Sequence, residues 1–168
     1  LGPHVRAFRG DGANVAKVGF YAYGTLRYGV NVSAADLDGD GHAEILTGAG
    51  PGGVFGPHVR AFDYDGVVIA PLGTVSFFAY GTLKYGVKPA SGDVDGDGFD
   101  EILTAPGPGE VFGPHIRGFN FDGGTLMAIQ KINIFCYGTL KYGANVAGGD
   151  VDTEPAFEEF VTGPGPGL

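Results

Sequence analysis

The chain has 168 residues, of which 43% are hydrophobic and 33 are glycine, and its formal net charge is −9 at pH 7. This length and hydrophobic content indicate one folded domain and exclude a disordered chain. The acidic balance argues against a nucleic-acid partner, because nucleic-acid binders present Lys and Arg to the phosphate backbone. No apolar stretch approaches the length that inserts into a membrane.

An internal repeat organises the sequence. Asp36, Asp93 and Asp150 open similar segments at intervals of 57 residues, and self-similarity at a fixed interval is typical of repeat architectures. The glycines recur at fixed places in each copy, which distinguishes the chain from low-complexity sequence. A second signature, Gly-Thr-Leu-(Arg/Lys)-Tyr-Gly, has the same interval and occurs at 24–29, 81–86 and 138–143.

Each repeat alternates short β-favouring runs with Gly, Pro and Asp turns, and no long window places apolar residues at helical spacing. Turns are expected at 95–98, 107–109 and 122–124 of the complete repeat. Four-stranded units recurring at such intervals are typical of β-propeller blades. We therefore predict an all-β propeller of four-stranded antiparallel blades, with strands in the complete repeat at Val87–Val94, Glu101–Ala105, Pro114–Phe121 and Ile132–Tyr137.

The whole chain, 1–168, is expected to form one propeller or half-propeller domain. The sequence begins and ends inside a connector that the internal copies cross without interruption, so the strands near the two termini are expected to be complementary halves of one blade. Three blades are fewer than the roughly four to eight that close a propeller. Either two chains pair into six blades or the chain is part of a longer propeller, with repeats at 28–84, 85–141, and 142–168 joined with 1–27.

Two Asp-rich loops have the pattern of a calcium site, with carboxylates at positions 1, 3, 5 and 9 and a turn-permitting Gly at position 6. Ca²⁺ takes six to eight oxygen ligands, which alternating Asp side chains and the carbonyl at position 7 can supply. An EF-hand is excluded, since position 12 is Thr and no helices flank the loops. The predicted ligands are Asp36, Asp38, Asp40, His42 and Glu44 in the first loop, and Asp93, Asp95, Asp97, Phe99 and Glu101 in the second.

Without a cation, four carboxylates this close would repel one another and raise each other's pKa. An ordinary Asp-Gly turn is the alternative, and Mg²⁺ fits less well because it demands strict octahedral geometry. The third loop departs from the pattern, since it lacks the Gly at position 6 and has one extra residue before the next strand. It is expected to be a degenerate third site formed by Asp150, Asp152, Glu154 and Glu158.

A Tyr-Gly pair, the acidic loop, an apolar strand and a Gly-Ala-Gly or Ala-Pro-Gly turn follow one another in the chain, and together they resemble the FG-GAP repeat of integrin α-chain propellers. The resemblance covers the chain three times over. It implies a β-propeller with calcium in the loops between the first two strands of each blade, in proteins that are mostly extracellular and mediate adhesion or recognition. The family's Phe-Gly positions correspond here to Tyr28-Gly29, Tyr85-Gly86 and Tyr142-Gly143.

No catalytic constellation is found: a nucleophile with a base, and paired carboxylates outside the loops, are both missing from the sequence. His and Arg recur together in the Gly-Pro-His-(Val/Ile)-Arg strands. They could line a ring that captures an acidic or sugar ligand, or they could hydrogen-bond the Gly-Pro loops or carboxylates of neighbouring blades. These pairs are His4 with Arg6, His58 with Arg60, and His115 with Arg117.

The sequence therefore predicts a non-catalytic, calcium-binding recognition module of the adhesion type. We expect it to be extracellular, periplasmic or on the cell surface, with a protein or glycan ligand and with self-association as a homo-oligomer. The alternatives are a carbohydrate-binding, lectin-like propeller and an accessory propeller of a larger secreted enzyme. The single Cys136 is expected to be a packed thiol.

Overall fold

The computed structural model describes residues 2–24, 27–82, 84–111, 113–138, 141–153 and 157–166. Strands, turns and bends make up these ranges, and no helix that could cross a membrane lies in them. The strands are β1 (His4–Phe8), β2 (Asn14–Tyr21), β3 (Val30–Ala35), β4 (Glu44–Ala49), β5 (His58–Tyr64), β6 (Ile69–Thr82), β7 (Val87–Gly92), β8 (Glu101–Pro106), β9 (His115–Phe121), β10 (Leu126–Phe135), β11 (Ala144–Gly149) and β12 (Glu159–Pro164).

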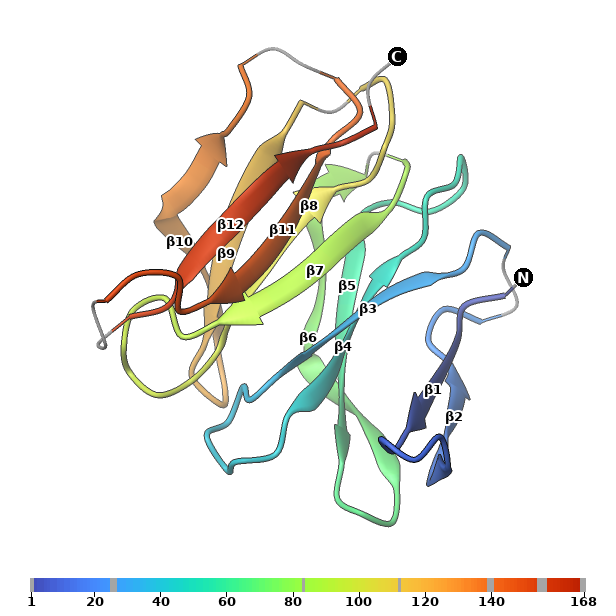
Figure 1. Cartoon of the computed structure of the whole chain (residues 1–168). Helices are drawn as coiled ribbons and strands as arrows, with labels where there is room; N and C mark the ends of the chain where they lie inside the picture. Colours follow the sequence, from blue (N-terminus) through green and yellow to red (C-terminus); the bar gives the residue numbers. More distant parts are fainter. Residues whose placement is uncertain are drawn as a thin grey trace.

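Two sheets have four strands each, in the order of the chain: β3-β4-β5-β6 and β7-β8-β9-β10. All of their neighbouring strands are antiparallel. Figure 1 shows the sheets following one another across the molecule. The prediction of an all-β fold with four antiparallel strands per repeat is confirmed for these two repeats.

The remaining strands form two separate two-stranded sheets, β1-β2 and β11-β12. They lie at opposite sides of the molecule, with both four-stranded sheets between them (Figure 1). The strands near the two termini therefore do not join into one blade within the chain, and the row of sheets is not closed. The two complete four-stranded sheets lie between these two pairs of strands and separate them.

Strand β10 differs from its prediction, because it begins at Leu126 rather than Ile132. Its pairing with β9 is interrupted between Ile129 and Asn133. Such a bulge disturbs the alternation of side chains by which a strand is recognised in sequence. The preceding turn lies where it was expected, and the Asp122 carboxylate accepts hydrogen bonds from the two backbone N–H groups that follow Gly123.

The hydrophobic cores lie between neighbouring sheets. Leu46 and Val59 of the β3-β6 sheet and Leu37 of the loop after β3 pack in one cluster with Val87 and Ile102 of the next sheet, and all five are fully buried. Two further clusters join β1-β2 to the β3-β6 sheet and the β7-β10 sheet to β11-β12. Burial between sheet faces holds successive repeats together, as in stacked blades.

Backbone segments approach one another so closely that only glycine fits at several places. A Cβ on Gly48 would lie 2.3 Å from the carbonyl oxygen of Val87 in the next sheet, and a Cβ on Gly107 would lie 1.7 Å from the carbonyl oxygen of Tyr85. Gly48 within β4 and Gly107 directly after β8 thus allow the backbone to approach another segment closely.

Three equivalent tyrosines stand where one sheet meets the next, and we call Tyr23, Tyr80 and Tyr137 the junction tyrosines. The Tyr80 hydroxyl lies 2.7 Å from the carbonyl oxygens of both Thr104 and His115. Tyr23 makes the same contacts with Thr47 and His58, at 2.9 and 2.8 Å. Burial raises the pKa of both phenols, so they stay protonated and able to donate.

Replacing Tyr80 with Phe is expected to lower the free energy of unfolding by about 1 to 2 kcal/mol, because buried carbonyl oxygens lose their hydroxyl partner. Urea denaturation measures the change. Tyr21→Phe is the control, since the Tyr21 side chain is 61% exposed and Phe keeps its ring stacked on His4. Equal losses in the two variants would contradict the assigned role of the junction tyrosine.

Candidate metal sites

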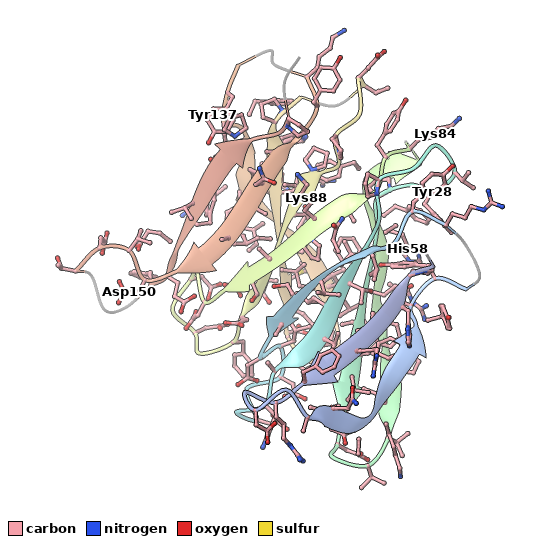
Figure 2. All side chains as sticks on the ribbon, turned by 45° about the vertical axis from the view of Figure 1, so that its right-hand side comes forward. Tyr28, His58, Lys84, Lys88, Tyr137 and Asp150 are labelled. Atoms are coloured by element: carbon pink, nitrogen blue, oxygen red, sulfur yellow. The ribbon has the colours of Figure 1, made fainter. Side chains whose placement is uncertain are left out.

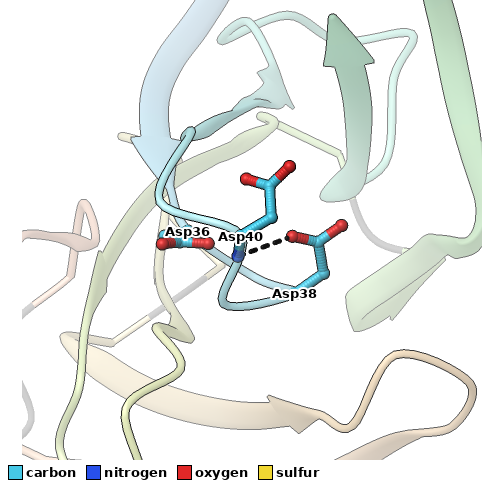
Figure 3. Close-up of side chains that lie close together, drawn as sticks. All are labelled: Asp36, Asp38 and Asp40. Atoms are coloured by element: carbon cyan, nitrogen blue, oxygen red, sulfur yellow. Dashed lines mark hydrogen bonds between the residues drawn. The ribbon is translucent and has the colours of Figure 1, made fainter. Parts of the chain in front are cut away.

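The first acidic loop connects β3 to β4 and is wound by its own carboxylates. Asp36 accepts hydrogen bonds from the backbone N–H groups of Gly39 and Gly41, at 2.8 and 3.0 Å. Asp38 accepts one from the N–H of Asp40 at 3.2 Å (Figure 3). Gly39 and Gly41 have φ values of 71° and 83°, the left-handed region that glycine enters without strain.

This winding brings carboxylate oxygens of Asp36, Asp38 and Asp40 within 4.8 Å of one another. Two oxygens on opposite sides of a Ca²⁺ ion, each about 2.4 Å from it, are about 4.8 Å apart. The spacing of the three side chains therefore fits one calcium ion. Figure 3 shows their carboxylates gathered at the turn.

The second loop, between β7 and β8, repeats the arrangement. Asp93 accepts hydrogen bonds from the backbone N–H groups of Gly96 and Asp97 through Oδ1 and from that of Gly98 through Oδ2, at 2.7, 3.1 and 3.0 Å. Oxygens of Asp93, Asp95 and Glu101 lie within 4.8 Å of one another. Each of the two loops thus gathers three carboxylates, although the third comes from position 5 in the first loop and from position 9 in the second.

The position 9 glutamates are the buried members of the loops. Glu44 is 3% exposed and Glu101 is 1% exposed. Each accepts a hydrogen bond that closes its loop, from the N–H of Leu37 at 2.8 Å and from that of Val94 at 2.9 Å. Burial, together with the neighbouring Asp carboxylates, raises the pKa of each glutamate to about 7.

The predicted ligands do not all converge. Asp97 lies outside the group of the second loop, and its Oδ1 accepts from the N–H of Phe99 at 3.0 Å. Glu44 lies outside the group of the first loop, although it accepts the same closing hydrogen bond as Glu101, which lies inside the group of the second. The carbonyl ligands assigned to His42 and Phe99 stay predictions.

In the third loop the structure gathers Asp150, Asp152 and Glu159 rather than Glu158. Glu159 accepts a hydrogen bond from the N–H of Val151 at 3.0 Å, as Glu44 and Glu101 do from their loops. The backbone N–H of Glu158 instead donates to the carbonyl of Asp93, at 2.7 Å. The predicted Glu154 lies outside the described residues.

Glu159 is a candidate ligand that the spacing of the Asp residues missed, because the third loop is one residue longer. The strand sequence Glu-Phe-Val-Thr, aligned with Glu-Ile-Leu-Thr, carries the signal that would have found it. The pairing of Gly149 with Glu159 repeats that of Ala35 with Glu44 and that of Gly92 with Glu101.

The recurring arginines contact neighbouring sheets. The guanidinium groups of Arg60 and Arg117 donate to the carbonyl oxygens of Ala22 and Ala79, which immediately precede junction tyrosines. Of the two roles predicted for the His and Arg pairs, these two arginines take the contact with a neighbouring sheet, but their acceptors are backbone carbonyls rather than the Gly-Pro loops or carboxylates that were expected.

The sequence profile of the FG-GAP repeat matches residues 28–78, which contain β3, the first acidic loop, β4 and β5. Integrin alpha-4 of Xenopus laevis is 30% identical to the chain over 129 residues. That match covers 71% of this chain and 12% of the integrin. Residues 28–78 therefore match an FG-GAP repeat, and the chain is similar to part of an integrin α-chain.

Proposed function

We propose that the chain is a calcium-binding β-propeller module that acts, without catalysis, in adhesion-type recognition outside the cytoplasm. The observation that carries the proposal is the convergence of carboxylate oxygens in two equally wound loops. The FG-GAP match and the similarity to an integrin α-chain support the recognition role and the extracellular location. A protein or glycan is the proposed ligand.

Contacts between loops support a structural role for the ions. The carbonyl oxygen of Asp36 accepts from the N–H of Asp100 in the next repeat at 2.8 Å, and the Asp100 carboxylate accepts from the N–H of Asp36 at 3.0 Å. Asp93 contacts Glu158 in the same way through its carbonyl oxygen. An ion that fixes one loop would therefore also fix the edge of the following repeat.

The repetition of the sites supports a non-catalytic function, because structural parts recur with each repeat whereas a catalytic centre is needed once.

The open row of sheets supports assembly, since a closed propeller needs roughly four to eight blades, more than the complete sheets found here. Self-association of two chains, or attachment to further repeats of a longer propeller, would supply the rest.

Calcium removal tests the proposal. With millimolar Ca²⁺ and a Kd of about 10⁻⁴ M, each filled loop should add roughly 1.4 kcal/mol to the free energy of unfolding. Differential scanning calorimetry should then show a melting temperature that falls on addition of EGTA and returns with excess Ca²⁺. Mg²⁺ at the same concentration is the control, and it should restore less of the lost melting temperature than Ca²⁺ does.

Calorimetric titration of the metal-free chain should give two Ca²⁺ ions per chain, one for each loop that has the position 6 glycine. A melting temperature that EGTA leaves unchanged, together with no heat of calcium binding, would refute the proposed role of the loops.

A further inference from the structure

We propose that the first two acidic loops bind Ca²⁺ cooperatively, because Phe99 and Asp100 of the second loop hold the first loop in its wound form. Each ion then raises the affinity of the other loop for calcium. The inference rests on the proposed calcium binding and specifies how the two sites regulate one another. It concerns the junction between the β3-β6 and β7-β10 sheets, in the interior of the chain.

Two hydrogen bonds join the loops at the residue that opens the first one. The N–H of Asp36 donates to the carboxylate of Asp100 at 3.0 Å, and the carbonyl oxygen of Asp36 accepts from the N–H of Asp100 at 2.8 Å. The carboxylate of Asp36 is also the one that winds the first loop, through Gly39 and Gly41. Asp100 therefore holds the backbone of a candidate calcium ligand through both of its polar groups.

The Phe99 ring makes a third contact, against the glycine at position 4 of the first loop. A Cβ on Gly39 would lie 2.7 Å from Cε1 of this ring, so the ring fills the space beside the Gly39 backbone. Gly39 has a φ of 71° and donates its N–H to Asp36. The ring of the second loop therefore packs on the turn that the first loop forms when it is wound.

The same two residues lie directly before a candidate ligand of the second loop. Glu101 belongs to the group of carboxylates with Asp93 and Asp95, and it is 1% exposed. Because Asp100 precedes Glu101 in the chain, its two bonds to Asp36 also restrict the backbone that carries Glu101. One set of contacts thus bears on ligands of both loops.

A fourth contact ties the strands that lead into the two loops. The Ser91 hydroxyl donates to the carbonyl oxygen of Ala34 at 2.6 Å. Ser91 and Ala34 each stand two residues before the first Asp of their own loop. The second loop is therefore held against the first repeat both where it begins and near its end.

The junction with the third loop has fewer of these contacts. Figure 2 shows Asp150, which opens the third loop, on the side of the molecule away from β1 and β2. The N–H of Glu158 donates to the carbonyl oxygen of Asp93 at 2.7 Å. Gly148, which has no hydroxyl, takes the place of Ser91. We therefore assign the coupling to the first two loops.

Cooperativity follows from how the cost of ordering is shared between the loops. The first ion to bind must order its own loop and, through these contacts, the edge of the other loop. The second ion then binds a loop that is already partly ordered. Coupling between sites is reciprocal, and factors of roughly 5 to 150 are typical. Repulsion between the two ions opposes the effect, but charges on exposed loops are screened at physiological salt.

Calorimetric titration of three chains measures the coupling factor. Asp38→Ala should leave only the second loop able to bind Ca²⁺, and Asp95→Ala only the first, and neither residue belongs to the contacts described above. The product of the two dissociation constants of the unaltered chain should be at least about fivefold smaller than the product of the constants of the two single-loop chains.

Independent loops would give equal products, and that result would overturn the inference, as would a larger product in the unaltered chain. In both cases the binding of two ions would leave the proposed function standing. Absence of any calcium binding would instead refute the proposed function itself.

Asp100→Ala tests the contact that carries the coupling. It removes the acceptor of the Asp36 N–H but no member of either carboxylate group. The same titrations in this background should still show two sites, with the coupling factor reduced toward unity. Asp100→Asn keeps an acceptor oxygen and should retain more of the coupling. Asp11→Ala is the matched control, since the Asp11 carboxylate also accepts a backbone N–H, from Ala13 at 2.8 Å. A factor that survives Asp100→Ala in full would overturn the assigned contact.

Hydrogen exchange followed by NMR gives a second readout, at a single amide. In the Asp38→Ala chain Ca²⁺ binds the second loop, yet it should slow exchange of the Asp36 N–H, in the first loop, at least about fivefold. The reason is that the acceptor of this N–H, Asp100, becomes fixed. The N–H of Ala13, which donates to Asp11, is the internal control and should exchange at an unchanged rate. Slowing confined to the second loop would overturn the inference.

Discussion

Replacing Leu103 with Ala is expected to lower the free energy of unfolding by about 3 kcal/mol. Leu103 is 0% exposed and packs against Ile116 and Ile132 of its own sheet and Ala144 of β11. Truncation removes buried methyl groups and leaves a cavity between two sheets that neither backbone can close. Urea denaturation with an unchanged m-value would report the loss.

Val161→Ala is the matched control, because Val161 occupies the same strand position in the third repeat but is 48% exposed. It should change the free energy of unfolding by less than about 1 kcal/mol. Similar losses in the two variants would show that burial between sheets does not decide the effect.

Replacing Asp93 with Ala should remove calcium binding from the second loop and destabilise the chain even without metal. Three backbone N–H groups lose their acceptor. Loss of these three hydrogen bonds should lower the free energy of unfolding by about 2 kcal/mol in EGTA. This value is within the range for hydrogen bonds from backbone N–H groups to a charged side chain in turns and helix caps. In the presence of Ca²⁺, loss of the bound ion should lower the free energy of unfolding by roughly 1.4 kcal/mol more.

Asp93→Asn separates the two effects, since the amide oxygen can still accept from Gly96 while the charge is gone. In EGTA this variant should retain more of the stability than Asp93→Ala. Calorimetric titration should fall from two Ca²⁺ ions to one in both variants. A titration that still gave two ions after Asp93→Ala would place the metal elsewhere.

The sequence predicts the parts of the fold that each repeat encodes locally. The turn at Asp122 and the loop that starts at Asp93 lie where their residue types place them, because Asp side chains and glycines determine those turns over a few residues. The first half of β10 was missed because a bulge before Asn133 breaks the alternation that identifies a strand.

Features that depend on contacts between repeats were harder to predict. The role of Tyr80 becomes visible only when β8 and β9 are placed beside it, since its acceptors are backbone carbonyls of another repeat. Glu159 was missed for a local reason, the extra residue of the third loop, although strand pairing places it opposite Gly149. Spacing in sequence thus located the loops but did not fix every side chain in them.

The hydrogen bonds that join successive loops have a consequence for how the repeats unfold. The carbonyl oxygen and the N–H of Asp36 both bond to Asp100 of the next repeat, so separating the two repeats leaves groups on both sides without a partner. Such coupling between neighbouring repeats favours their unfolding as one unit. The two complete repeats should therefore melt in a single transition rather than one after the other.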